Sequence, residues 1–209
     1  MPKRITYLTK RSDLSAEQFS AHWSTSHAAI AVNLPGIESY RQNHVVGGGS
    51  SVYNVDGIVE LWFANDEVVT AGIDSEVADL LVEDEPRFLS GLVGGAVDSG
   101  APTQYWPTKV WVLARWTDQD ASDVLVAWSR RTARGIGAVA AVNIVDPSGP
   151  QLTRERLTVN PRPPQVAVCF GLESGQDPEH ARATVLREAA RLDSLADLDV
   201  LLAEEKVIV

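Results

Sequence analysis

Two short stretches of the 209-residue chain recur in its second half. Trp23-Ser24 is echoed by Trp128-Ser129 within a helical pattern, and Asn43-His44-Val45 is echoed by Asn143-Ile144-Val145 within a strand pattern. The two echoes occur in the same order along the chain. This internal repeat predicts that two copies of one α+β unit are fused in tandem.

The spacing of apolar residues predicts the same order of elements in both halves: strand, helix, strand, strand, helix, strand. In the first half we expect strands at residues 4–10, 37–46, 56–64 and 93–97, one helix beginning after Ser15, and a second at 67–90 with breaks near Gly72 and Pro86. In the second half we expect strands at residues 109–116, 138–145, 165–172 and 199–209, a helix capped by Asp120 and another at 177–192. The units are therefore placed at residues 1–99 and 108–209, with a linker at residues 100–107.

The charge balance limits the partners of the chain. It has 18 Lys and Arg against 28 Asp and Glu, a formal net charge of −10, which disfavours a phosphate backbone. Arg130, Arg131 and Arg134 form one short basic run, which fits a helix end. No stretch has the length of a membrane span or the pattern of a signal peptide, and Cys169 is the only cysteine. We expect a cytoplasmic monomer or homodimer with no metal, nucleic-acid or membrane partner.

Residues 15–36 predict an amphipathic helix that carries a histidine. Ser15 and Gln18 have the spacing of a capping box, which places the helix start just after Ser15. Leu34-Pro35-Gly36 must end the helix, because proline cannot continue its hydrogen bonds. His27 lies beside the buried stripe. That stripe is formed by Phe19, Trp23, Ser26 and Ile30.

The strand that follows carries Tyr40, Asn43 and His44. A histidine late in a helix and a tyrosine on the next strand can meet in one cleft, and both can move protons. In the register of the internal repeat, Thr132 stands where His27 stands and Ala140 where Tyr40 stands. We therefore expect one asymmetric site per chain, built mainly by the first unit.

The first half resembles a known family through a run of spaced residues. These are Lys10-Arg11, Leu14-Ser15, Glu17, Phe19, Trp23, His27-Ala28, Leu34-Pro35-Gly36, Tyr40 and Gln42-Asn43-His44. Residues 3–95 resemble the EthD-type family of the dimeric α/β-barrel superfamily. The resemblance implies ferredoxin-like units whose sheets pack face to face around a barrel-like cavity, with the fused second half acting as an internal partner.

The resemblance also implies a kind of chemistry. Relatives include methylmuconolactone methylisomerase, and the wider superfamily includes muconolactone isomerase, polyketide cyclases and cofactor-free anthrone oxygenases. His27 and Tyr40 match positions that look catalytic in the methylisomerase, whereas a cysteine that serves there has no counterpart. We expect a cofactor-independent lyase, isomerase or cyclase acting on a small aromatic or polycyclic substrate in the barrel cavity. The alternatives are a non-catalytic protein that binds a hydrophobic metabolite and a cofactor-free oxygenase of the anthrone type.

Two residues are candidates for catalysis. Near pH 7 a neutral imidazole can take or give a proton, so His27 is the candidate acid or base. Its alternative role is to bond the last carbonyls of the helix. Tyr40 could donate a hydrogen bond to a developing oxyanion, or it could simply pack.

Four residues are candidates for substrate binding. Asn43 and His44 would position the substrate, and Trp23 and Trp62 would line the cavity, with core packing as the alternative for both tryptophans.

The remaining histidines are assigned no catalytic role. His22 is five residues from His27, which turns it about 140° around an α-helix, and it is expected to be structural or exposed. His180 is expected to be solvated, so a haem-binding role, known elsewhere in the superfamily, does not suit it.

Overall fold

The computed structural model describes residues 1–48, 52–73, 75–97, 104–118, 121–146 and 149–209. Asp120 and residues 100–103 of the expected linker lie outside these ranges. The first half contains β1 (Lys3–Lys10), α1 (Ala16–His22), a π-helical segment (Trp23–His27), α2 (Ala28–Ala31), β2 (Ile37–Gly47), β3 (Gly57–Phe63), α3 (Asp66–Ile73), α4 (Glu76–Asp84), a 3₁₀ turn (Glu85–Arg87) and β4 (Leu89–Val97). The second half contains β5 (Thr108–Trp116), α5 (Ser122–Ile136), β6 (Val139–Ile144), β7 (Val166–Leu172), α6 (Pro178–Ala189) and β8 (Leu195–Val207).

Local sequence signals account for most of these boundaries. The Ser15 hydroxyl accepts from the Gln18 backbone at 3.2 Å, and the Gln18 side chain accepts from the Ser15 backbone at 2.9 Å, so the capping box is confirmed. Asp177 caps α6 by accepting from the backbone N–H groups of Glu179 and His180. Strands β4 and β8 both begin earlier than predicted, at Leu89 and Leu195.

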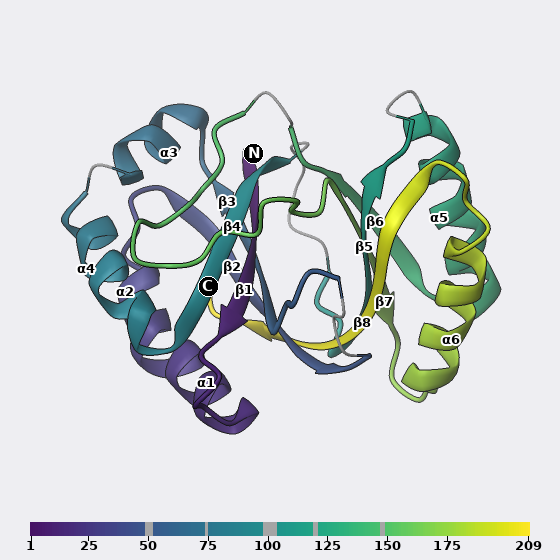
Figure 1. The fold of residues 1–209 in the computed structure, drawn as a ribbon, viewed down its shortest axis with the longest axis horizontal. Helices are drawn as coiled ribbons and strands as arrows, with labels where there is room; N and C mark the ends of the chain where they lie inside the picture. The colour runs from purple at the N-terminus through teal and green to yellow at the C-terminus, as the bar shows by residue number, and fades with distance from the viewer. Residues whose placement is uncertain (49–51, 74, 98–103, 119–120, 147–148) are drawn as a thin grey trace.

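All eight strands form one antiparallel sheet in the order β4-β1-β3-β2-β8-β5-β7-β6. The pairing of β2 with β8 joins the two units. Helices α1 to α4 lie outside one half of the sheet, and α5 and α6 lie outside the other (Figure 1). The sheet curls until its outer strands approach, since Val97 in β4 bridges Val145 just after β6. The predicted α+β fold with two ferredoxin-like units and facing half-sheets is therefore confirmed.

The second repeated stretch, which contains Asn43 in one unit and Asn143 in the other, has a structural explanation. Asn43 donates its side-chain amide to the carbonyl of Ile58, which lies opposite it on β3. Asn143 does the same to Ala167, opposite it on β7. Each asparagine therefore ties the second strand of its unit to the third by an extra hydrogen bond.

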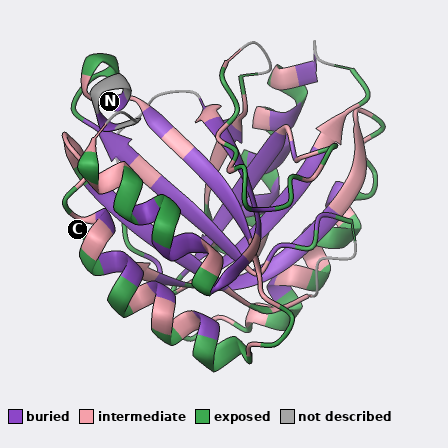
Figure 2. Ribbon diagram, turned by 60° about the vertical axis from the view of Figure 1, so that its left-hand side comes forward, coloured by how far each residue is buried: buried purple, intermediate pink, exposed green. Residues whose placement is uncertain are grey.

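Most strand residues of the two half-sheets are buried (Figure 2), and side chains from both half-sheets fill the space between them. One part of it is an apolar cluster. That cluster includes Ile5, Tyr7, Ile58, Val93, Trp111, Leu113, Ala167, Cys169, Leu201 and Ala203. These residues alternate along their strands with residues that face the helices, as the two-residue period of a strand requires.

The other part of the interior is a buried network of charges. Lys109 Nζ lies 2.9 Å from Glu60 Oε2 and 2.7 Å from Glu205 Oε1. Lys3 Nζ lies 2.7 Å from Glu60 Oε1, and Arg41 Nη1 lies 3.0 Å from Glu205 Oε1. Burial opposes the charge of Glu60, but Lys3 and Lys109 prevail and lower its pKa to about 2. Both units contribute to this network, so it joins them at the centre of the molecule.

The interior packing corrects one expectation. We expected the substrate cavity between the facing sheets, with Trp62 and Asn43 in its lining. Trp62 instead packs under the ammonium group of Lys3, 4.5 Å from its ring centroid, and Asn43 donates to Glu60 Oε2. A recess of about 240 Å³ lies at one end of the interior. The larger pocket, described below, lies on the other face of the sheet.

No helix in the described ranges is long and apolar enough to cross a membrane.

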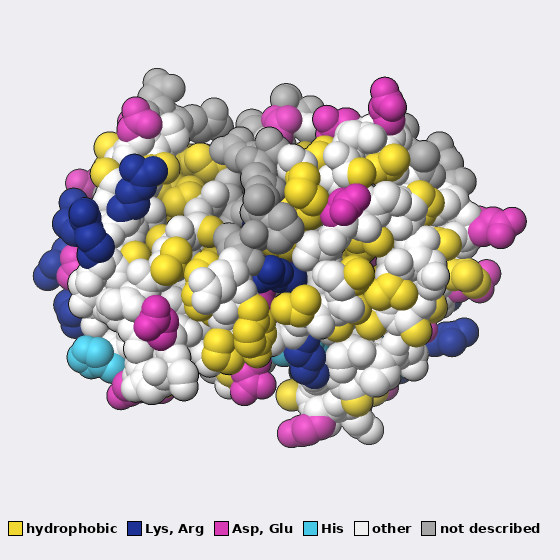
Figure 3. Space-filling model, turned by 180° about the vertical axis from the view of Figure 1, so that it is seen from behind, with side chains coloured by type: hydrophobic (Ala, Val, Ile, Leu, Met, Phe, Trp, Pro, Cys, Tyr) yellow, Lys and Arg dark blue, Asp and Glu magenta, His cyan; other side chains and the backbone are white. Residues whose placement is uncertain are grey.

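On the face shown in Figure 3, acidic side chains are interspersed with Lys and Arg.

Candidate functional site

A pocket of about 440 Å³ lies between the outward face of the N-terminal half-sheet and helices α2 to α4. Residues 150–154 of the second unit cover part of it, where Leu152 pairs with Gly94 at the free edge of β4. Most of its walls are apolar. They include Leu8, Ala31, Leu34, Val59, Leu61, Phe63, Val69, Leu81, Leu89 and Leu92. Its size and apolar walls are typical of small-molecule sites.

The π-helical segment Trp23–His27 determines where the N-terminal histidines point. Hydrogen bonds in a π-helix join residues five apart, so such residues stack on one side of it. His22 Nε2 lies 3.0 Å from both oxygens of Asp84, and His27 Nδ1 lies 3.1 Å from Asp84 Oδ2. The prediction that His22 and His27 point about 140° apart is therefore wrong, because it assumed α-helical geometry throughout.

His27 is buried, with 11% of its side chain exposed, and it lines the pocket. An ionised carboxylate can only accept hydrogen bonds, so the Nδ1 atom that faces Asp84 must carry a proton. The lone pair of the neutral ring is then on Nε2. Within the described ranges no hydrogen bond engages Nε2, so this atom can act as a base.

Asp84 and Phe88 hold the two imidazoles in place. Burial opposes the charge of Asp84, but hydrogen bonds from His27 and His22 prevail and lower its pKa below the ordinary value. The ring of Phe88 lies 4.8 Å from that of His22 and 4.9 Å from that of His27, measured between centroids. An ionised Asp84 orients His27 and would stabilise an imidazolium if Nε2 took a proton.

A second ion pair in the pocket joins the two units. Arg154 Nε lies 2.6 Å from Glu85 Oε2, and Arg154 Nη2 lies 3.2 Å from Glu85 Oε1. Burial raises the pKa of Glu85, and Arg154 opposes that shift. Arg154 comes from the second unit and lines the pocket, so the second unit supplies a polar residue to the site.

Tyr40 lines the same pocket, but its hydroxyl belongs to a buried hydrogen-bond chain. The oxygen accepts from Trp23 Nε1 at 3.0 Å and from Gln42 Nε2 at 2.8 Å. Burial raises the pKa of Tyr40, and these two hydrogen bonds oppose the shift. The hydroxyl therefore stays protonated, with its own hydrogen left to donate.

The four expected substrate-binding residues do not line this pocket. Asn43 and Trp62 face the barrel interior. His44 and Trp23 are buried together, with ring centroids 4.3 Å apart, and His44 Nε2 lies 3.0 Å from Gln42 Oε1. Burial, with a smaller effect of Lys206, lowers the pKa of His44 to about 3. A ligand in the pocket would meet His27 and Tyr40 but none of these four.

Sequence reasoning missed several polar residues of the site, among them Asp84, Glu85 and Arg154. Asp84 and Glu85 directly precede Pro86, where the helix was expected to break, and that position gave no reason to pair either with a distant partner. Arg154 lies in a proline-rich connection whose path over β4 depends on the tertiary fold. His180 is exposed on α6, as expected.

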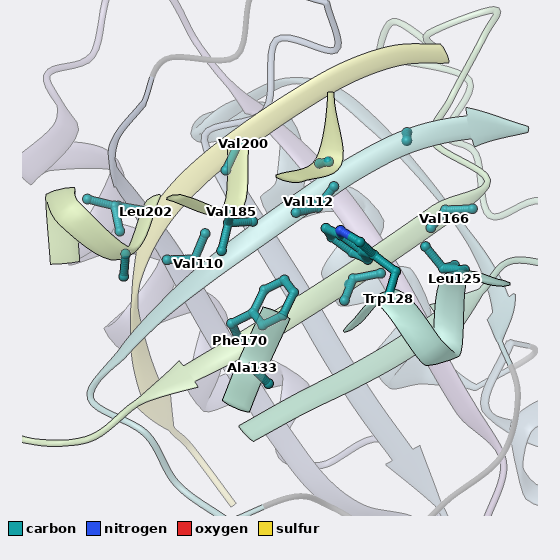
Figure 4. Packing of buried hydrophobic residues seen from close by; sticks show 14 of the residues in the cluster. Val110, Val112, Leu125, Trp128, Ala133, Val166, Phe170, Val185, Val200 and Leu202 are labelled. Atoms are coloured by element: carbon teal, nitrogen blue, oxygen red, sulfur yellow. The ribbon is translucent and has the colours of Figure 1, made fainter. Parts of the chain in front are cut away.

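In the second unit, the space between the helices and the half-sheet corresponds to the pocket of the first unit, and a hydrophobic cluster fills it. Trp128 of α5 packs edge-on to Phe170 of β7, with ring centroids 5.6 Å apart (Figure 4). Val110, Leu125 and Val185 in this cluster are fully buried. The repeat therefore kept the helix-on-sheet packing in both units, while His27 and the pocket occur in the first.

Comparisons with known proteins agree with this architecture. Residues 11–91 match the model of the EthD domain. No curated protein matches the sequence significantly.

Solved structures match along nearly the whole chain. An anthrone oxidase-like protein is 11% identical with a TM-score of 0.59, and the match covers 99% of this chain and 93% of that one. A monooxygenase candidate from Fusobacterium nucleatum is 8% identical with a TM-score of 0.58, over 99% and 93% of the two chains. A chlorite dismutase candidate is 10% identical with a TM-score of 0.56, over 99% and 95%. At these identities the likeness establishes the fold alone. Residues 11–91 are therefore an EthD domain, within a chain that has the fold of the two-unit dimeric α/β-barrel proteins.

Proposed function

We propose that this chain is a cofactor-independent enzyme that moves a proton to or from a carbon atom of a small aromatic or polycyclic substrate, as a lyase, isomerase or cyclase does. The observation that carries the proposal is the pairing of His27 with Asp84 at the wall of an apolar pocket. Such a pair supplies a positioned base, and the pocket supplies a surface for a flat apolar molecule.

This geometry supports the following proton step. His27 Nε2 takes a proton from a C–H group next to a substrate carbonyl, and the electrons of the C–H bond move into the carbonyl to give an enolate. Asp84 stabilises the resulting imidazolium. Tyr40 donates its hydroxyl hydrogen to the enolate oxygen. Return of the proton to a different carbon completes an isomerisation with no net oxidation or reduction.

Deuterium exchange tests the step without knowledge of the natural substrate. Anthrone and α-tetralone are incubated with the protein in D₂O, and deuterium at the acidic carbon is followed by NMR. His27→Gln should slow the enzyme-dependent exchange by about 10²- to 10⁴-fold, the usual contribution of a general base. His180→Gln, which changes an exposed histidine of the other unit, should leave the rate unchanged.

Three readouts separate the alternatives. Equal exchange by the wild type and His27→Gln would exclude His27 as the base. Quenching of tryptophan fluorescence by the ligands without any exchange would indicate a binding protein instead. Oxygen uptake with anthrone, in which CH₂ and O₂ give C=O and water, would indicate an oxygenase that begins with the same proton step.

A further inference from the structure

Arg4 is a cation at the pocket whose side chain has no bonded partner among the residues that the structure describes. It lies on the outward face of β1 with Thr6 and Leu8, and all three residues line the pocket. Within the described ranges, its guanidinium forms no hydrogen bond and no ion pair. The exposed Asp66 at the start of α3 acts on it only through its charge, and burial lowers the pKa of Arg4.

The other basic groups at the pocket are already engaged. Arg154 gives two hydrogen bonds to Glu85 and a third, at 3.3 Å, to the carbonyl of Thr153. His27 is bound to Asp84. Of the described cationic residues that line this pocket, Arg4 is therefore the one whose donors can all turn to a ligand.

The strand register places Arg4 and His27 toward opposite ends of the pocket. His27 packs on Phe88, which precedes Leu89, and Leu89 pairs with Lys10 at the end of β1. Arg4 pairs with Ala96, near the other end of β4. From Leu8 to Arg4 the strand spans about 13 Å at the usual rise per residue. An elongated molecule of two or three fused rings can bridge such a distance.

A half-buried guanidinium that makes no hydrogen bond loses hydration, and the charge of Asp66 offsets that loss only in part. Its planar donors fit a carboxylate in a two-point arrangement, and an apolar surround strengthens that contact. The walls next to Arg4 on the sheet are apolar, since Leu61 pairs with it on β3 and Phe63 lies on the same face.

We propose that the ligand of this pocket is an aromatic or polycyclic acid, whose carboxylate binds Arg4 while its ring system extends along the apolar walls toward His27. This inference deepens the proposed function and rests on it for the identity of the reacting end. It assigns Arg4 as the residue that selects acidic over neutral substrates.

A matched pair of fluorescent ligands tests the assignment. 2-Anthracenecarboxylate and 2-anthracenecarboxamide have the same ring system and differ in the charge of the terminal group. Their binding to the wild type, Arg4→Gln and Arg131→Gln is measured by fluorescence anisotropy at constant ionic strength. Arg131 is an exposed arginine of α5, so its variant removes the same charge away from the pocket.

The wild type should bind the acid about 10- to 100-fold more tightly than the amide, as expected for hydrogen bonds to a charged group. Arg4→Gln should remove that preference while amide binding stays within about twofold, and Arg131→Gln should keep it. Retained amide binding also shows that the variant pocket is folded.

An unchanged acid preference in Arg4→Gln would overturn the assignment, and so would the absence of any preference in the wild type. Neither result affects the deuterium exchange that tests His27, so the two proposals can fail separately.

Discussion

The Nδ1 atom of His27 lies 3.1 Å from Oδ2 of Asp84, although 57 residues separate the two in the sequence. The contact depends on the π-helical segment that ends at His27, which brings His22 to the same carboxylate. A regular α-helix would turn the two imidazoles about 140° apart, and Asp84 could then bind only one of them. A local widening of one helix therefore creates the pair to which we assign the proton step.

Replacing Asp84 by asparagine should weaken the base while leaving the pocket in place. The neutral amide of Asp84→Asn could not stabilise an imidazolium by charge, and it could turn His27 into the wrong tautomer. We expect enzyme-dependent deuterium exchange to fall at least about tenfold, while the affinity for 2-anthracenecarboxamide stays the same. Asp79→Asn is the control, because Asp79 is an exposed acid of the same helix α4 at the pocket. An unchanged exchange rate in Asp84→Asn would show that His27 works without this carboxylate.

Much of the fold could be predicted from the sequence, because the signals that specify it are local. The repeat of Asn43 as Asn143, the capping box at Ser15 and the stop at Pro35 all act within one or two neighbouring elements. The element order of both units followed from them.

The location of the pocket could not be predicted in this way. Glu60 and Lys109 lie on strands that the sequence pattern predicts to be largely buried and apolar. A charged residue on a strand is ordinarily assumed to face water. These charges instead join the two units inside the barrel, which leaves the helix-covered face for the pocket. The π-helical segment has no distinct signal either, since its residues continue the helical spacing.

Lys109 should be essential to stability because it bridges two buried carboxylates. Lys109→Met would leave Glu60 and Glu205 without their shared cation, and removal of one member of a buried ion pair destabilises a protein by about 3–5 kcal/mol. Urea unfolding followed by tryptophan fluorescence measures the loss. Lys206→Met is the control, since Lys206 is half-buried and, among the described residues, its ammonium group hydrogen-bonds only to the hydroxyls of Ser20 and Ser24 and forms no ion pair. Equal midpoints for the two variants would contradict the central role of Lys109.

The same network should make stability depend on pH in the acid range. The pKa of Glu60 is lowered from 4.5 to about 2, because Lys3 and Lys109 outweigh the effect of burial. A lowered folded-state pKa means that the stabilisation is present above pH 4.5 and is lost as the pH falls toward 2. The difference in unfolding free energy between the wild type and Glu60→Gln should therefore shrink over this range. A difference that stays constant from about pH 6 to about pH 3 would show that the charge of Glu60 does not stabilise the fold.

Gly57 should tolerate no side chain, because Trp23 packs directly against its backbone. A Cβ at Gly57 would lie 2.6 Å and 2.8 Å from ring carbons of Trp23, and 3.3 Å from the ring of Phe19. Gly57→Ala should therefore destabilise the protein by about 1–3 kcal/mol and displace the helix that carries His27. Gly135→Ala is the matched control, because a Cβ there meets nothing within 4 Å on α5 and should stabilise the helix by about 0.5–1 kcal/mol. Urea unfolding measures both changes, and deuterium exchange should fall only in Gly57→Ala. If Gly57→Ala matched the wild type in both measurements, the close packing of Trp23 on β3 would not be what positions His27.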